Sequence, residues 1–147
     1  MKVRAAEAGD LDRLLELYDL LEGPYLWTDA LCREDSRRLF MRVLADPDQT
    51  TLVAEEDGWL VGTLVLIVVP NLAHGGSPYA VVENLVVEES RQGRGIGKAL
   101  ILEAMYRARR SGAYKLSLTS NTKRAESHEL YRRLGFRETH LGFEVDP

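Results

Sequence analysis

The chain has 147 residues, of which 45% are hydrophobic and 29% charged, and its formal net charge at pH 7 is −4. Since one domain takes roughly 150 residues, this length predicts a single domain over residues 1–147. The composition excludes a disordered, collagen-like or low-complexity chain. The longest apolar run, at residues 59–69, is well short of the roughly 20 residues that cross a bilayer. No signal-peptide pattern opens the sequence, so we expect a cytoplasmic protein that does not contact membranes.

Charge is distributed unevenly along the chain. Residues 91–133 hold eleven basic and three acidic residues, a net +8, and the remainder carries −12. A basic segment in an acidic chain suggests a local anion site, although solvated helix faces account for part of these charges. A nucleic-acid binder would more often be basic throughout, so we expect no nucleic-acid partner. The one cysteine, Cys32, excludes an internal disulfide and a cysteine-cluster metal site, and we expect no metal.

The first half of the chain predicts a strand, two helices and a hairpin. Residues 3–5 form a short strand, and Asp10 caps a helix that ends at Gly23-Pro24. A second helix spans about 30–45. Strands at 51–55 and 59–69 are joined by Asp57-Gly58, which suits a two-residue hairpin turn. The apolar stripes of the two helices are expected at Leu11, Leu14, Leu15 and Leu21, and at Leu39, Phe40, Val43 and Leu44.

The second half alternates strands and helices. Residues 71–78 form a loop, and residues 80–87 are apolar enough for a central strand buried on both faces. A helix at about 98–111 follows the loop 88–97, and then come a strand at 114–119, a helix at about 122–134 and a last strand at 136–145. This order predicts an α/β fold with a mixed, mostly antiparallel central sheet of six to seven strands and helices on both faces.

The segment Arg91-Gln92-Gly93-Arg94-Gly95-Ile96-Gly97-Lys98 lies between the expected central strand and a helix. Its three alternate glycines allow close backbone approach, and the unpaired amides at the start of a helix attract anions. This arrangement suits a pyrophosphate. A glycine-rich loop without a ligand is the alternative.

Three phosphate-binding patterns can be compared with this segment. A nucleotide P-loop needs Ser or Thr after Gly-Lys, but Ala99 follows Lys98. A dinucleotide loop that begins at Gly93 needs glycine where Lys98 stands. The third pattern, Gln/Arg-x-x-Gly-x-Gly/Ala, is matched by Gln92, Gly95 and Gly97.

This third pattern resembles the pyrophosphate loop of the GNAT superfamily of acyl-CoA-dependent N-acetyltransferases. Two further segments are similar to that family in order: Val-Val-Glu-Asn-Leu-Val-Val at residues 81–87 and a stretch at 121–136 that ends Leu-Tyr-Arg-Arg-Leu-Gly-Phe. The resemblance implies transfer of an acetyl group from acetyl-CoA, the cosubstrate, to a primary amine of a small molecule, by direct attack in a ternary complex. Three alternatives stay open: a non-catalytic acyl-CoA-binding regulatory module, a protein or peptide N-acetyltransferase, and a nucleotide-binding enzyme.

The resemblance also implies roles for single residues. The expected cofactor-binding set is Leu85, Val86 and Val87 for the pantetheine arm, Gln92, Gly93, Arg94, Gly95, Ile96, Gly97 and Lys98 for the pyrophosphate, and Asn121. Asn121 could instead cap a helix. Tyr131 is expected near the thioester sulfur, where it would assist the departing thiol, and the alternative is a core tyrosine.

Glu83 is the expected catalytic base. It lies in an otherwise apolar strand, where desolvation should raise the pKa of its carboxyl; pairing with an arginine is the alternative. The expected acceptor-binding residues are Tyr25, Trp27, Asn71, His74 and Tyr79. Core packing is an equal alternative for Trp27, and an exposed loop position is the commoner outcome for a histidine such as His74. His128 is more typical of a helix surface than of a proton relay, and a covalent intermediate at Cys32 is not expected. Exposed strand edges, including residues 136–145, make a homodimer plausible.

Overall fold

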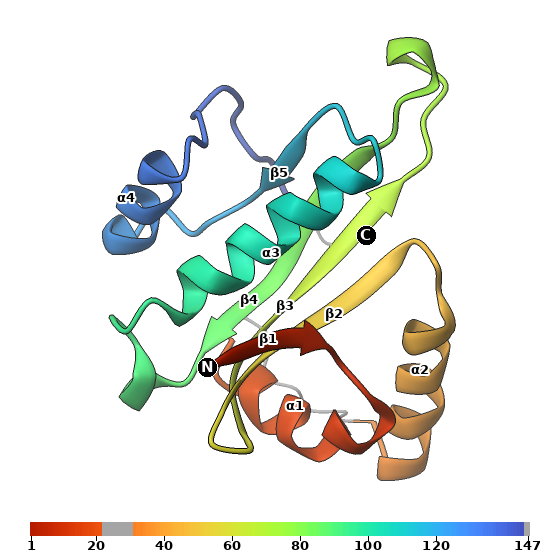
Figure 1. Ribbon diagram of the computed structural model, residues 1–147, viewed down its shortest axis with the longest axis vertical. Coiled ribbons are helices and arrows are strands. Elements are labelled where there is room, and N and C mark those ends of the chain that lie inside the picture. Colours follow the sequence, from red (N-terminus) through yellow and green to blue (C-terminus); the bar gives the residue numbers. More distant parts are fainter. Residues whose placement is uncertain (22–30, 146–147) are drawn as a thin grey trace. The chain divides into compact units, whose positions relative to one another are not determined.

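The computed structural model describes residues 1–21 and 31–145. The described strands form one sheet in the order β1-β2-β3-β4-β5 (Figure 1). Their bounds are β1 (Lys2–Ala5), β2 (Gln49–Glu56), β3 (Trp59–Val69), β4 (Tyr79–Val87) and β5 (Leu116–Leu118). The α-helices are α1 (Leu11–Tyr18), α2 (Arg33–Ala45), α3 (Ile96–Arg110) and α4 (Ala125–Arg133). Contacts divide the chain into two compact units, Met1–Ser117 and Leu118–Pro147, and each is described by itself.

The sheet is mixed, as the sequence predicts. Strands β1 to β4 pair antiparallel in succession. The turn between β2 and β3 is the predicted one, with φ of 51° at Asp57 and 80° at Gly58. The residues just before β5 bond to the start of β4: the Tyr114 amide donates to the Pro78 carbonyl and the Ala80 amide to the Lys115 carbonyl, both at 2.9 Å. Both strands therefore start at the same end of the sheet and run parallel.

Helices cover both faces of the sheet in the first unit (Figure 1). On one face, Leu14 and Leu17 of α1 and Phe40 of α2 form a core with Val53 and Val86. On the other, α3 buries a stripe that consists of Ile96, Leu100, Ile101, Ala104 and Ala108. The sheet is thus the middle layer of three, which is how a two-faced apolar sheet is shielded from water.

Gly62 in β3 lets α3 approach the sheet closely. A Cβ at this position would lie 3.0 Å from the Val86 carbonyl oxygen, 3.2 Å from Ile96 Cγ2 and 3.3 Å from Leu100 Cδ1. A side chain here would force these neighbours to move by a few tenths of an ångström. The close approach fixes the first turn of α3 against β3 and β4.

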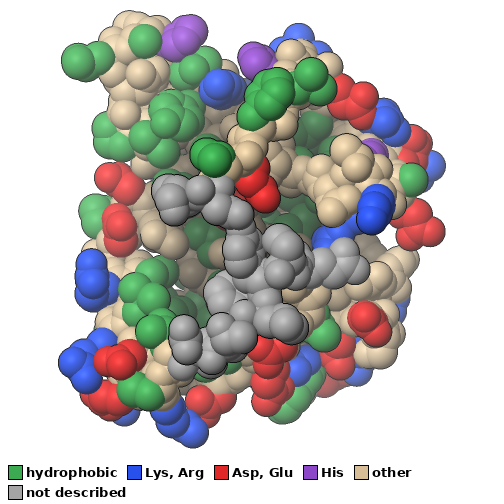
Figure 2. Space-filling model, turned by 180° about the vertical axis from the view of Figure 1, so that it is seen from behind, with side chains coloured by type: hydrophobic (Ala, Val, Ile, Leu, Met, Phe, Trp, Pro, Cys, Tyr) green, Lys and Arg blue, Asp and Glu red, His purple; other side chains and the backbone are tan. Residues whose placement is uncertain are grey.

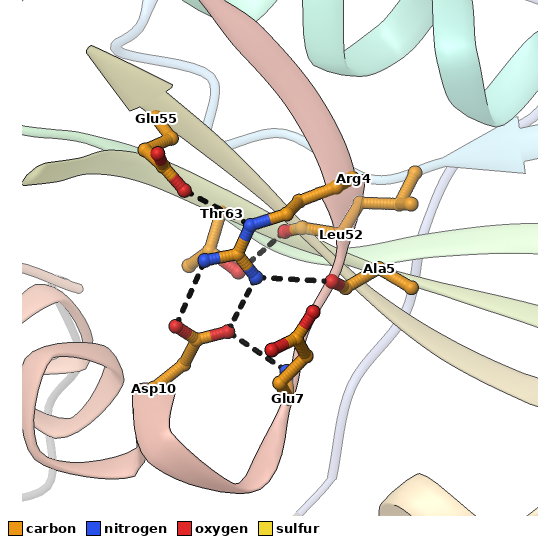
Figure 3. Close-up of polar contacts among 7 residues, drawn as sticks. All are labelled: Arg4, Ala5, Glu7, Asp10, Leu52, Glu55 and Thr63. Carbon is orange, nitrogen blue, oxygen red and sulfur yellow. Dashed lines mark hydrogen bonds and ion pairs between the residues drawn. The ribbon is translucent and has the colours of Figure 1, made fainter. Parts of the chain in front are cut away.

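A charged network ties β1 to the turn before α1 (Figure 3). The Arg4 guanidinium donates to both Asp10 carboxylate oxygens, at 2.7 and 3.0 Å, and its Nε donates to Glu55 at 3.0 Å. The Arg4 contact lowers the pKa of the Asp10 carboxyl below its usual 3.8. Asp10 was predicted to cap α1, but its carboxylate makes no such bond and accepts from the Glu7 amide at 2.8 Å instead.

Several predicted element bounds are wrong. Helix α1 ends at Tyr18 rather than at Gly23-Pro24. Leu15 and Leu39, which were expected on the apolar stripes, are exposed, whereas Leu17 is buried. Helix α3 begins at Ile96, two residues earlier than predicted. No strand occurs within residues 136–145, so the described sheet has five strands rather than six to seven. Within the described residues, no helix is both long and apolar enough to cross a membrane.

The second unit contains α4 and the chain that follows it. The Tyr131 and Phe136 rings meet edge to face with centroids 5.9 Å apart, and the Phe136 amide donates to the Tyr131 carbonyl. Beyond them, Leu141, Phe143 and Val145 alternate along the chain and are each at least 85% exposed. The strand predicted at residues 136–145 is therefore replaced by irregular chain whose apolar side chains are exposed.

Candidate functional site

The loop between β4 and α3 is built on two left-handed glycines. After β4, the Glu88 amide donates to the Val61 carbonyl and a short 3₁₀ turn covers Glu89–Arg91. Gly93 and Gly95 then have φ of 74° and 84°, and Gly95 is the N-cap of α3. Side chains rarely adopt such angles, which explains why glycine occupies both positions.

None of the amides of residues 93–98 makes a hydrogen bond within the described residues. The first amide of α3 that does so is that of Ala99, which donates to the Gly95 carbonyl at 3.0 Å. A Cβ at Gly93 or Gly95 would meet no atom within 4 Å. Free amides at the positive end of a 15-residue helix are suited to bind an anion. Residues 93–98 therefore form the donor nest on which the site is built.

Three cations accompany the donor nest. Arg91 Nη1 lies 3.2 Å and Arg94 Nη2 3.6 Å from the same oxygen, Oε2 of Glu56. The Lys98 side chain is exposed and makes no ion pair with the described residues. Each arginine keeps further N–H donors beyond the one that faces Glu56, since a guanidinium has five.

Strand β4 carries a bulge in front of the loop. Asn84 has φ of 52°, and the pairing with β3 shifts between Thr63 and Val65, so that Asn84 and Leu85 together oppose Leu64. Asparagine tolerates this left-handed conformation better than most residues. The bulge turns the backbone of β4 away from a regular ladder just before its last three residues.

The last residues of β4 offer backbone groups on the edge away from β3. The Glu88 amide faces β3, so by alternation the groups of Val86 also face β3 and those of Leu85 and Val87 face the other edge. The Gln92 side chain confirms this direction, because its Nε2 donates to the Val87 carbonyl at 3.1 Å. Backbone contacts to a ligand would thus come from Leu85 and Val87.

Glu83 is exposed, which corrects the expectation of a strand buried on both faces. Glu83 pairs with Val65 as Val86 pairs with Thr63, so Glu83 and Val86 lie on the same face, the one on which α1 packs. The described residues hold no arginine or lysine paired with it, so the expected alternative of an ion pair is also absent.

The predicted acceptor residues are only partly brought together. His74 stacks on Tyr114 with ring centroids 4.0 Å apart, and Lys115 Nζ lies 5.6 Å from the Tyr114 ring and 5.7 Å from that of Tyr79. The Asn71 amide is used within its own loop, where Nδ2 donates to the carbonyls of residues 73 and 77. Tyr25 and Trp27 lie outside the described residues.

In the second unit, burial raises the pKa of the Tyr131 phenol above its usual value of about 10, although the charge of Arg124 opposes the shift. The Tyr131 phenol is therefore neutral at physiological pH. Asn121 does not cap α4, which begins at Ala125; its Oδ1 accepts from the Lys123 amide at 2.9 Å. His128 Nε2 contacts the Asn121 carbonyl oxygen at 2.9 Å, which uses the ring in the local turn.

Much of the basic segment is neutralised locally. Arg107 pairs with Glu103 at 2.7 Å and Arg133 with Glu129 at 3.0 Å, each one turn away on the same helix. Figure 2 shows the molecule from behind, and on that face acidic and basic side chains are interspersed. Within the part of the chain that the structure describes, no group of three or more His, Cys, Asp or Glu could hold a metal ion.

Two residues of this region were not singled out from the sequence. Asn84 could have been, because Glu-Asn in the middle of an apolar strand is a signal for a bulge. Glu56 could not, since a glutamate that ends a hairpin strand has no distinguishing local pattern.

Comparisons with known proteins agree with this geometry. The model of the acetyltransferase (GNAT) family matches residues 14–136. Over 147 residues the chain is 33% identical to glucosamine 6-phosphate N-acetyltransferase from Trypanosoma brucei brucei, an alignment that covers 99% of this chain and 95% of that protein. It is 32% identical over 104 residues to aminoalkylphosphonate N-acetyltransferase from Salmonella typhimurium, covering 71% of this chain and 67% of the relative.

Among solved structures, an acetyltransferase from Trypanosoma brucei matches with a TM-score of 0.81 and 30% identity, and the match covers 99% of each chain. The family model spans β2 to β5, the donor nest and α4 in a single match. This chain belongs to the acetyltransferase (GNAT) family and is an acyltransferase.

Proposed function

We propose that this protein transfers the acetyl group of acetyl-CoA to a primary amine of a small molecule. The observation that carries the proposal is the donor nest, in which the amides of residues 93–98 lack acceptors at the start of α3. A diphosphate matches this nest in charge and in its need for several donors.

The residues present fit CoA. The donor nest and the side chains of Arg91, Arg94 and Lys98 would hold the diphosphate, and the backbone of Leu85 and Val87 would bond the amide groups of the pantetheine arm. Acetyl-CoA supplies the acetyl group as a thioester. The contribution of the protein at this step is positioning, which removes much of the entropic cost of bringing an amine and a thioester together.

Glu83 would accept the proton of the amine. A primary ammonium with a pKa of about 10.4 is only about 0.04% free amine at pH 7, so a base is required for rapid attack. Glu83 lies exposed beside the bulge of β4, where a carboxylate can take the proton directly or through water. Tyr131, kept neutral by burial, would donate a proton to the departing thiolate.

The acceptor class follows from the relatives and stays part of the proposal. The names of the two relatives describe a phosphorylated amino sugar and an aminoalkylphosphonate as acceptors. Each is a small primary amine that also carries a phosphoryl anion. We therefore expect a small amine of this kind to be the acceptor of the present protein.

A panel assay tests this function. The purified chain is mixed with acetyl-CoA and, separately, with glucosamine 6-phosphate, aminoethylphosphonate, glucosamine and a short peptide, and the thiol released is measured with a colorimetric reagent. Fast thiol release with a phosphoryl amine supports the proposal. Tight CoA binding without turnover on any amine would show a binding module instead, and release with the peptide alone would show a peptide acetyltransferase.

A further inference from the structure

One carboxylate links both arginines of the loop to the sheet. Glu56 Oε2 lies 3.2 Å from Arg91 Nη1 and 3.6 Å from Arg94 Nη2. The Glu56 side chain is only 16% exposed, whereas Arg91 and Arg94 are 37% and 51% exposed. The two arginines precede and follow Gly93 in the sequence, so Glu56 links the two sides of a left-handed glycine.

The sheet gives Glu56 a rigid base. Glu56 is the last residue of β2 and pairs with Trp59 across the tight turn to β3. Strand β3 in turn pairs Gly62 with Val87, the last residue of β4, and the Val61 carbonyl accepts from the Glu88 amide at 2.9 Å. The end of the hairpin and the beginning of the loop therefore lie at the same end of the sheet.

We propose that Glu56 is a positioning residue for the diphosphate of the acyl donor, because it holds Arg91 and Arg94 beside the donor nest before the ligand arrives. The inference rests on the proposed function of the nest. Ordering two long side chains and a glycine-rich loop costs free energy on binding, and a contact that orders them beforehand lowers this cost. The remaining donors of each guanidinium stay available for phosphate oxygens.

A carboxylate near an anion site also repels the anion. Positioning and repulsion therefore predict opposite changes in CoA affinity when the carboxylate is removed. If Glu56 acted only through its charge, it would repel the diphosphate, and its removal would tighten binding. Both arginines contact the carboxylate and screen its charge from the nest. We therefore expect the loss of positioning to exceed the relief of repulsion, so that removal of the carboxylate weakens binding.

The experiment compares Glu56→Gln with Asp57→Asn. Asp57 is the next residue and makes no ion pair with the described residues, and asparagine tolerates its left-handed φ of 51°, so this control removes the same charge without releasing an arginine. Calorimetric titration with CoA should show about a tenfold higher Kd for Glu56→Gln, about 1.4 kcal/mol, and an unchanged Kd for Asp57→Asn.

Kinetics separate positioning from a general structural effect. For Glu56→Gln, KM for acetyl-CoA should rise about tenfold while kcat is retained, and turnover of acetyl-pantetheine, which lacks the diphosphate, should match the wild type. Equal losses with acetyl-CoA and acetyl-pantetheine would overturn the inference, and so would unchanged or tighter CoA binding.

A double-variant cycle tests whether Glu56 acts through the two arginines. Arg91→Gln combined with Arg94→Gln changes only partly exposed side chains, and Glu56→Gln should add nothing to the loss of CoA affinity in this background. An additive loss would contradict the inference. A wild-type protein that does not bind CoA would overturn the proposed function itself, which is a different result from the loss of the Glu56 effect.

Discussion

Two glycine-rich loops flank β4, and each contains two glycines in the left-handed backbone conformation. The loop before the strand, residues 71–78, has Gly75 and Gly76 at φ of 68° and 80°. The loop after it has Gly93 and Gly95 at 74° and 84°. A Cβ at any of the four would meet no atom within 4 Å. Glycine alone therefore does not distinguish the two loops.

The loops differ in what their polar groups do. In the first, the amides of Gly76 and Ser77 each donate to the carbonyl three residues back, the Asn71 side chain closes the turn, and a strand follows. In the second, the amides of residues 93–98 are free, a helix follows, and arginines stand on both sides of Gly93. An anion site needs the helix start and the cations, and glycine only makes the turn possible.

The largest effect on activity is expected from a substitution in β4, the strand between the two loops. Glu83→Gln should lower kcat about a hundredfold, the usual loss when a general base is removed, and should leave CoA affinity unchanged because the donor nest is intact. Steady-state kinetics with the best acceptor and CoA titration give the two numbers. An unchanged kcat would remove Glu83 as the base and leave the role of the loop unaffected.

Matched substitutions in the two loops test the comparison itself. Gly95→Val and Gly75→Val each force a β-branched residue into a left-handed conformation at an open position. With about 2 kcal/mol of strain at the nest, Gly95→Val should weaken CoA binding about 30-fold, whereas Gly75→Val should leave it unchanged. Isothermal titration measures both, and circular dichroism shows whether each variant is folded. Similar CoA affinities for the two variants would contradict the assignment of the nest.

The packing beneath the second loop can be disturbed separately. Gly62→Ala places a methyl group 3.0 Å from a backbone oxygen and near two α3 side chains, and overpacking of this kind costs about 2 kcal/mol of unfolding free energy. Urea unfolding measures the loss. Gly9→Ala is the control, because its new Cβ meets no atom within 4 Å, and it should be neutral or slightly stabilising. Equal stabilities would mean that α3 does not depend on this close approach.

The smallest effect is expected far from both loops, at the Arg4–Asp10 pair. The pKa of Asp10 is lowered by Arg4, so the stability that this pair contributes is complete above the usual pKa of 3.8 and is lost as the pH falls through the lower folded value. Asp10→Asn should cost about 1 kcal/mol near neutral pH and progressively less below 3.8. Urea unfolding over this pH range measures it. A difference that does not depend on pH would show that the charge of Asp10 is unimportant.

The sequence predicted the elements whose signals are local. The Asp57-Gly58 turn, the apolar strand of residues 59–69 and the glycine that ends α4 all needed only neighbouring residues. The predicted bounds of helices and strands were wrong where tertiary contacts determine them. Helix α3 begins at Ile96 because this side chain is buried under Gly62, and residues 136–145 form no strand although their apolar residues alternate.

In the candidate site, too, only the features that depend on neighbouring residues could be predicted from the sequence. The donor nest follows from glycine spacing and a helix start, both visible in the chain. The exposure of Glu83 could not be predicted, because it depends on the face of β4 that this residue occupies next to a bulge that shifts the register. The link from Glu56 to Arg91 and Arg94 spans more than thirty residues and depends on sheet pairing, which no local pattern encodes.

Backbone amide chemical shifts during a CoA titration test the central claim most directly. In two-dimensional ¹H–¹⁵N spectra of the whole chain, the amides of residues 93–98 should shift downfield as they gain acceptors, while those of Gly75 and Gly76 stay in place. Shifts that leave residues 93–98 unaffected, or that are equal in both loops, would contradict the account.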